Sequence, residues 1–169
     1  NCPLTSSAGR WFDAAAAALG LCYSQEDEAQ AAIALEQAAA RALLLQPDLP
    51  ALSGAVLCSN GIIDLRLLLA QLFDAADIDA AAAGFHLALA DALASALINA
   101  AAQRQTRSAA LGGGCFFNRI LRERLIQRLT AAGLAVYLPG PQGCGDAGLA
   151  IGQAWVAAQQ LAAPARENV

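Results

Sequence analysis

The chain has 169 residues, a length that fits one domain with a sizeable buried core. All ten basic residues are arginine, which excludes a P-loop with its phosphate-binding lysine and any mechanism that begins with a lysine Schiff base. The net charge of −4 and the lack of a basic tract argue against a nucleic-acid surface.

The first half of the chain predicts two helices followed by a hairpin. A helix is expected after the candidate caps Ser6 and Ser7, ending near Gly20. A second helix covers "AAIALEQAAARALLL", which follows an acidic segment and is stopped by Pro47 and Pro50. The segments "GAVLCS", "NG" and "IIDL" predict a hairpin with a tight two-residue turn, since Asn-Gly supplies the positive φ that such a turn demands.

The second half predicts helices and then alternating strands and helices. We expect helices from about Leu65 to Phe73 and from about Asp79 to Gln103. Strand "SAAL", a glycine loop, a helix from about Asn118 to Ala132, strand "LAVYL", a Pro/Gly loop and a helix from Asp146 to about Leu161 follow. Such alternation with short loops predicts parallel strands in an α/β layer architecture, with ligands at the carboxyl ends of the strands.

The chain's location is predicted from its cysteines and its most apolar window. Five cysteines, odd in number and without a CxxC pair, favour a reducing cytoplasm. The window around residues 81–102 owes its hydropathy to alanine and contains Asp91, which a bilayer strongly disfavours. This window therefore predicts a buried helix of a soluble protein.

The glycine loop is the first candidate site. Gly112, Gly113 and Gly114 stand between a strand and a helix, where backbone amides and a helix amino terminus can receive a phosphate. The pattern is neither GxxxxGK[ST] nor GxGxxG, so a plain tight turn remains an alternative. Asn118 either caps the following helix or presents its amide at the mouth of the loop.

Other polar residues allow two interpretations each. Asp146 either caps the last helix or is an oxygen ligand for a metal that carries a nucleotide's phosphates. Gly148 and Gly152 would let that helix pack closely on the sheet. His86 is the only histidine, so no catalytic triad or H-x-x-x-H site can be completed, and a structural role is expected. The arginines of the helix after Asn118 predict a solvated face.

Five segments resemble the carboxyl-terminal part of the hydrogenase maturation carbamoyltransferase family HypF. They are "PLTSSAGRWFDAAAAALGL", "EAQAAIALE", "AGFHLALADAL", "LGGGCFFNRILRERL" and "GDAGLAIGQA", in order and over nearly the whole chain. The resemblance implies a helix-rich α/β fold, a three-layer actin-like ATPase (ribonuclease H-like) lobe with additional helices. The chain starts at Asn1 and lacks methionine, so we expect residues 1–169 to be the carboxyl-terminal portion of a Kae1-like domain in a longer protein.

The resemblance also implies an activity. In the family, this module accepts a carbamoyl-adenylate that another domain makes from carbamoyl phosphate and ATP. It passes the carbamoyl group to the carboxyl-terminal cysteine thiol of a HypE-type acceptor protein, and the group later becomes cyanide on the hydrogenase iron. The expected partners are therefore that acceptor and upstream domains of the same protein, with no nucleic acid and no membrane.

The family's site residues can be transferred to matching positions only. The residues that would border the nucleotide are Ser7, Gly9, Arg10, Asp13, Gly113, Gly114 and Asn118. Asp146 would complete a site for a divalent metal, which is iron, zinc or magnesium. The paired histidines of the family's metal site are missing here, so we expect the isolated chain to be inactive.

The chain departs from the family pattern at five positions, which bear on substrate fit more than on the fold. Glycine replaces serine at 112 and asparagine at 145, cysteine replaces valine at 115, phenylalanine replaces glutamine at 117, and alanine replaces glycine at 29. Alternatives within the same fold are an O-carbamoyltransferase and a tRNA threonylcarbamoyltransferase. The tRNA enzyme's G-E-A-x-D-K pattern is matched poorly by Gly9, Arg10 and Asp13. A noncatalytic half-domain that docks partners is a further alternative.

Overall fold

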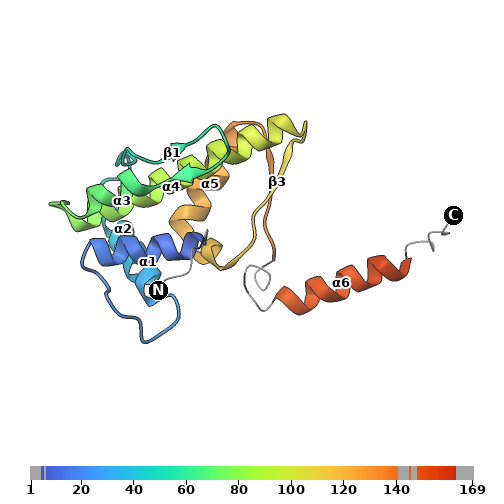
Figure 1. The fold of residues 1–169 in the computed structure, drawn as a ribbon, viewed down its shortest axis with the longest axis horizontal. Coiled ribbons are helices and arrows are strands. Elements are labelled where there is room, and N and C mark those ends of the chain that lie inside the picture. The colour runs from blue at the N-terminus through green and yellow to red at the C-terminus, as the bar shows by residue number, and fades with distance from the viewer. Residues whose placement is uncertain (1–4, 6, 141–144, 146–147, 163–169) are drawn as a thin grey trace.

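The computed structural model describes residue 5, residues 7–140, residue 145 and residues 148–162. In chain order, the elements of this part (Figure 1) are α1 (Ala8–Ala18), α2 (Gln30–Leu45), β1 (Val56–Leu57), β2 (Ile63–Asp64), α3 (Arg66–Leu72), α4 (Ile78–Gln103), β3 (Ser108–Ala110), the 3₁₀ helix η1 (Gly114–Phe117), α5 (Arg119–Ala131), β4 (Ala135–Tyr137) and α6 (Leu149–Ala162). The helix-rich α/β class is confirmed, and each predicted helix and strand is present. The turn η1 was not predicted.

Helix α4 forms the centre of the fold, with α2 and α5 packed along it. The segment from Ala81 to Ala90 is buried on every side. Alanine makes this possible, because its small side chain lets neighbouring helices approach closely. By length and composition α4 could cross a membrane, but 67% of its most apolar window is buried inside the protein. This burial agrees with the predicted core helix.

One close contact fixes the start of α4 against the chain before it. The N–H of Leu52 donates to the carbonyl of Gly84 at 3.0 Å. A Cβ on Gly84 would lie 2.7 Å from Cγ of Leu52, so a larger residue at 84 would clash with the leucine side chain.

The two small sheets have the expected pairing. Strands β3 and β4 are parallel, with Ala109 opposite Val136, and helix α5 connects them. This arrangement confirms the strand, helix, strand unit. Strands β1 and β2 are antiparallel, with Leu57 opposite Ile63.

The hairpin turn differs from the prediction. The N–H of Cys58 donates to the carbonyl of Ile62, and the N–H of Gly61 donates to the carbonyl of Cys58, so residues 59–61 form a three-residue loop. Gly61 has a φ of 81°, but Asn60 is not among the residues with positive φ. Asn60 instead accepts a hydrogen bond from the N–H of Ile62 through its side chain. Both of the favoured two-residue turns need positive φ at the first central residue, which would be Asn60, so that prediction is wrong.

The prediction for α5 is confirmed on its buried side and wrong for part of its arginine face. Leu121, Leu125 and Leu129 are buried as expected. Arg124, however, makes two hydrogen bonds to the carboxylate of Asp91 on α4, with Nε 2.8 Å and Nη2 2.9 Å from its oxygens. Arg128 adds a third contact to the same carboxylate at 3.3 Å. These arginines clamp α5 to α4.

Helix α6 stands apart from the rest of the described fold (Figure 1). Its large apolar side chains, including Trp155, are exposed. A Cβ on Gly152 would meet no atom within 4 Å, so the expected close packing of this helix on the sheet is wrong in the described structure.

The residue just before helix α2 has a backbone conformation that alanine rarely adopts. Ala29 has a φ of 59° and a ψ of 13°, the left-handed conformation that glycine adopts without strain. This is the position where the resembling family carries glycine. The backbone at this position therefore suits the glycine of the family pattern better than the alanine present here.

We expect Ala29→Gly to stabilise the protein by roughly 0.5–1 kcal/mol, because removing the left-handed strain outweighs the added entropy of the unfolded chain. Thermal unfolding measures this as a melting temperature that rises by about 1–4 °C. Ala34→Gly, in the middle of α2, is the matched control and should lower stability by about 1 kcal/mol. Equal losses in both variants would contradict the assigned strain.

Candidate functional site

Two predicted motifs meet in one cleft. This α1–α2 cleft has a volume of about 400 Å³ and is lined by residues of α1, the start of α2, η1 and Asn118. It contains Gly9, Arg10 and Asp13 of the first motif and Gly114 and Asn118 of the second. More than 100 residues of chain separate the two motifs, so their meeting supports a shared site.

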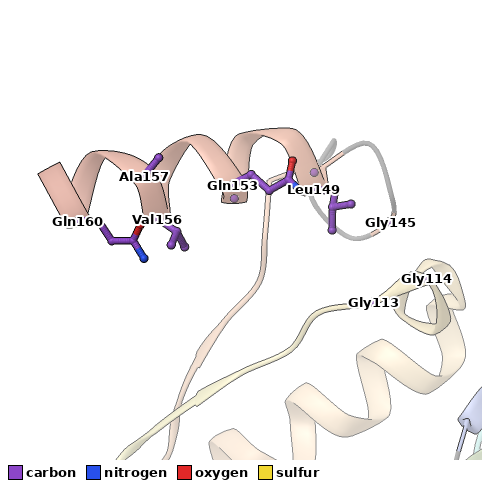
Figure 2. Close-up of a pocket in the computed structure, with 10 residues that line it drawn as sticks. Gly113, Gly114, Gly145, Leu149, Gln153, Val156, Ala157 and Gln160 are labelled. Atoms are coloured by element: carbon purple, nitrogen blue, oxygen red, sulfur yellow. The ribbon is translucent and has the colours of Figure 1, made fainter.

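A second hollow, the glycine groove, lies between the glycine loop and α6 (Figure 2). Its volume is about 720 Å³, and Gly113, Gly114, Gly145 and Gly152 line it together with Leu149 and other residues of α6. Gly114 lines both hollows. Ser7 lies at the start of α1 without a side-chain cap and lines neither hollow.

The glycine loop leaves backbone donors available. Gly113 has a φ of 108°, which requires glycine. Gly114 has no such requirement, and a Cβ there would meet no atom within 4 Å. Among the described residues, none accepts a hydrogen bond from the amide of Gly113 or Gly114. The fold alone does not explain the glycine at 114, whereas a ligand in close contact with the backbone would.

Two backbone amides at the start of α5 donate hydrogen bonds to side chains of the protein. The N–H of Leu121 donates to Oδ1 of Asn118 at 2.9 Å, so the predicted cap is present. The N–H of Arg119 donates to Oε1 of Glu36 on α2 at 2.6 Å. Because these two amides are occupied, the end of this helix offers a phosphate fewer donors than the glycine loop does.

His86 is a core residue, as expected. It is fully buried, its Nδ1 lies 2.8 Å from the carbonyl of Ala82, and its Nε2 lies 2.9 Å from Nδ2 of Asn118. Burial lowers the pKa of His86 from 6.5 to about 4, so the ring is neutral at pH 7.

The α1 side of the cleft carries a carboxylate oxygen that is ion-paired but not hydrogen-bonded. Nη2 of Arg10 lies 2.8 Å from Oδ2 of Asp13. That oxygen is buried and, apart from this ion pair, receives no hydrogen bond within the described part of the chain. Burial, with the negative charge of Asp13, raises the pKa of the Cys115 thiol. Cys115 is therefore a protonated thiol at neutral pH.

Glu28 and Glu36 line the cleft without having been predicted as site residues, and Cys115 and Phe117 were named only as departures from the family pattern. Glu36 lies seven residues after Ala29, on the same face of α2, and this spacing is a signal that was available. Cys115 and Phe117 follow the predicted glycines directly.

Two departures from the family pattern lie side by side. A Cβ on Gly145 would be 3.1 Å from a ring carbon of Phe117, so a side chain at 145 would have to displace that ring. Asparagine at 145 in the family pattern and phenylalanine at 117 here would compete for the same space.

The predicted metal ligand is Asp146. Asp146 lies outside the described residues, and within these no group of three His, Cys, Asp or Glu side chains lies close enough to hold a metal. His86 is unsuited as a ligand because both of its ring nitrogens have partners. The described residues therefore do not form a metal site by themselves.

Comparisons with known proteins agree on one family. Residues 1–153 match the family model described as the carbamoyltransferase Kae1-like domain, second subdomain. The chain is 51% identical to a carbamoyltransferase HypF homolog of Cupriavidus necator, over 95% of this chain and 42% of that protein. It is 39% identical to the carbamoyltransferase HypF of Rhizobium leguminosarum, over 94% of this chain and 20% of that protein.

A solved structure has the same fold. A crystal structure of full-length HypF in a phosphate- and nucleotide-bound form superposes with a TM-score of 0.81 and 28% identity, over 95% of this chain and 21% of that one. The chain thus spans less than half the length of each of these relatives.

We predict that stability falls between pH 6.5 and pH 4 because of His86. The unfolded chain binds a proton on this histidine below about pH 6.5, whereas the folded chain does so only near pH 4. Above this window His86 makes its whole contribution to the free energy of unfolding, and the loss across the window is on the order of 3 kcal/mol. Urea unfolding at several pH values should show a smaller loss for His86→Gln. Equal pH dependence in both proteins would contradict the assignment.

Proposed function

The chain belongs to the HypF carbamoyltransferase family, and we propose that it supplies the nucleotide-facing second lobe of such an enzyme. Residues 1–169 would form the carboxyl-terminal portion of a Kae1-like domain in a longer cytoplasmic protein. Upstream domains would complete the catalytic unit. The nucleotide- and phosphate-bound relative supports the choice of ligand.

The observation that carries this proposal is the glycine loop beside a buried carboxylate. Gly113 and Gly114 have amides without an acceptor among the described residues, and these would donate to the phosphate of an adenylate. Oδ2 of Asp13 lacks a hydrogen bond and would accept one from a hydroxyl of the ribose. Gly114 lines both hollows, so a ligand could contact both walls.

The proposed reaction is the transfer of a carbamoyl group from carbamoyl-adenylate to a thiol. The sulfur of a carboxyl-terminal cysteine on a HypE-type acceptor would attack the carbamoyl carbon. A C–S bond forms, the bond from that carbon to the phosphate oxygen breaks, AMP leaves, and the thiol proton passes to solvent. The glycine-loop amides would stabilise the charge that develops on the departing phosphate.

Cys115 is a poor candidate for the accepting thiol within this chain. Its raised pKa leaves it protonated, and a thiol rather than a thiolate is a weak nucleophile. This supports an acceptor thiol that comes from another protein. A divalent metal bound with Asp146 would add positive charge near the phosphate, with further ligands from outside the described residues.

We expect the whole protein, given carbamoyl phosphate labelled with ¹⁴C and ATP, to label a peptide that ends in the acceptor's cysteine. The same peptide with a terminal serine is the control, since a hydroxyl at neutral pH is a far weaker nucleophile. Labelling of a sugar or of tRNA in place of the peptide would replace this proposal with one of the other transferases. A chain that only binds the missing lobe, with no labelling, would indicate a noncatalytic docking module.

We predict that Gly114→Ala weakens the binding of ATP with Mg²⁺ by about tenfold, because a methyl group would enter the space that the phosphate uses. Folding stability should change little, since that methyl group meets no protein atom. Gly112→Ala is the matched control, because its Cβ also meets nothing and it lines neither hollow. Calorimetry on the two variants checks this, and equal affinities would contradict the phosphate site.

A further inference from the structure

We propose that His86 is a positioning residue of the α1–α2 cleft, which it acts on by fixing the side chain of Asn118. The inference rests on the proposed function in one respect, namely that the cleft receives a nucleotide. His86 itself touches no ligand, because it is fully buried beneath the cleft. Its effect passes through Asn118, which is part of the cleft lining.

The hydrogen bonds at Asn118 determine which end of its amide faces His86. The backbone N–H of Leu121 can only donate, so the atom of Asn118 that it contacts at 2.9 Å must be the oxygen. The amide nitrogen is then the atom that lies 2.9 Å from Nε2 of His86. Because this nitrogen is a donor, Nε2 has to be the acceptor and carries no proton.

The other ring nitrogen fits the same assignment. Nδ1 of His86 lies 2.8 Å from the carbonyl of Ala82, which can only accept. Nδ1 must therefore carry the proton of the neutral ring. One tautomer satisfies both contacts, and the backbone of α4 selects it.

The position of Asn118 matters for the glycine loop. Asn118 directly follows η1, and its N–H donates to the carbonyl of Cys115 at 3.2 Å. Its side chain accepts a hydrogen bond from the N–H of Leu121, three residues later, and so caps the start of α5. Holding this one side chain therefore fixes both the 3₁₀ turn that begins at Gly114 and the first turn of α5.

His86 also connects this corner of the cleft to α1. Its ring centroid lies 5.2 Å from that of Phe12, which lines the cleft from α1 one residue before Asp13. The ring centroid of Phe85 lies 6.1 Å from that of His86, in an edge-on arrangement. The histidine thus joins the two walls that carry the predicted nucleotide motifs. An apolar side chain could fill the same space but could not accept the hydrogen bond.

The first test uses the fact that His86 is the only histidine of the chain. In ¹⁵N spectra of the 169-residue chain at pH 7, its imidazole signals need no further assignment. We expect the neutral form with the proton on Nδ1. A proton on Nε2 would overturn the proposal, because Nε2 could then not accept from Asn118.

The second test compares two amide replacements of the ring. His86→Gln can place its side-chain oxygen near the position of Nε2, whereas the shorter side chain of His86→Asn reaches only the position of Nδ1. We expect His86→Gln to bind ATP with Mg²⁺ nearly as the unsubstituted chain does, and His86→Asn to bind about tenfold more weakly. Hydrogen exchange at the amide of Leu121 should become faster in His86→Asn alone.

A control separates positioning from general destabilisation. Leu72→Ala removes a buried side chain of α3 that does not line the cleft, and should lower global stability without selective exchange at Leu121. If His86→Gln behaves as His86→Asn does, the acceptor on His86 does not position the cleft. If the unsubstituted chain binds no ATP, the proposed nucleotide function fails for this chain, and the exchange at Leu121 alone decides the role of His86.

Discussion

The fold depends on how an alanine-rich helix is held in register. Alanine lets α4 approach its neighbours closely, but its small side chains interlock weakly, so apolar packing alone leaves sliding and rotation poorly specified. Two polar contacts supply the missing specificity between α4 and α5. His86 meets Asn118 at the start of α5, and Asp91 holds Arg124 and Arg128 further along. His86 and Asn118 are buried, Asp91 and Arg124 are partly buried, and Arg128 is exposed; each contact is directional.

These two polar contacts between α4 and the start and middle of α5 also determine where the site forms. Because the start of α5 is fixed against α4, the preceding turn η1 is fixed as well, and the glycine loop lies opposite α1. Glu36 on α2 contributes the carboxylate that satisfies the first amide of α5. The cleft is therefore bordered by three helices whose relative positions are set beneath it, while the amides of Gly113 and Gly114 remain available to a ligand.

The departures from the family pattern fall at the edges of this arrangement. Alanine at 29 retains a left-handed backbone that suits glycine, and Phe117 occupies the space beside Gly145. The Asn118 hydrogen bonds and the buried face of α5 are independent of both changes. The fold can accept such changes because they alter side chains around the cleft without removing a contact that positions it.

The sequence by itself determined the helices, the parallel strand unit and the family, because these follow from local periodicity, from glycine and proline positions and from motifs read in order. It also offered a cap as one of two roles for Asn118 and predicted a structural role for His86. Only the tertiary structure decided that these two residues bond to each other, that Glu36 reaches the start of α5, and that arginines expected in solvent hold Asp91. These contacts join residues between 32 and 83 positions apart in different elements, a relation that local patterns do not encode. The hairpin loop was also decided by geometry, since the side chain of Asn60 bonds the backbone in place of the expected turn.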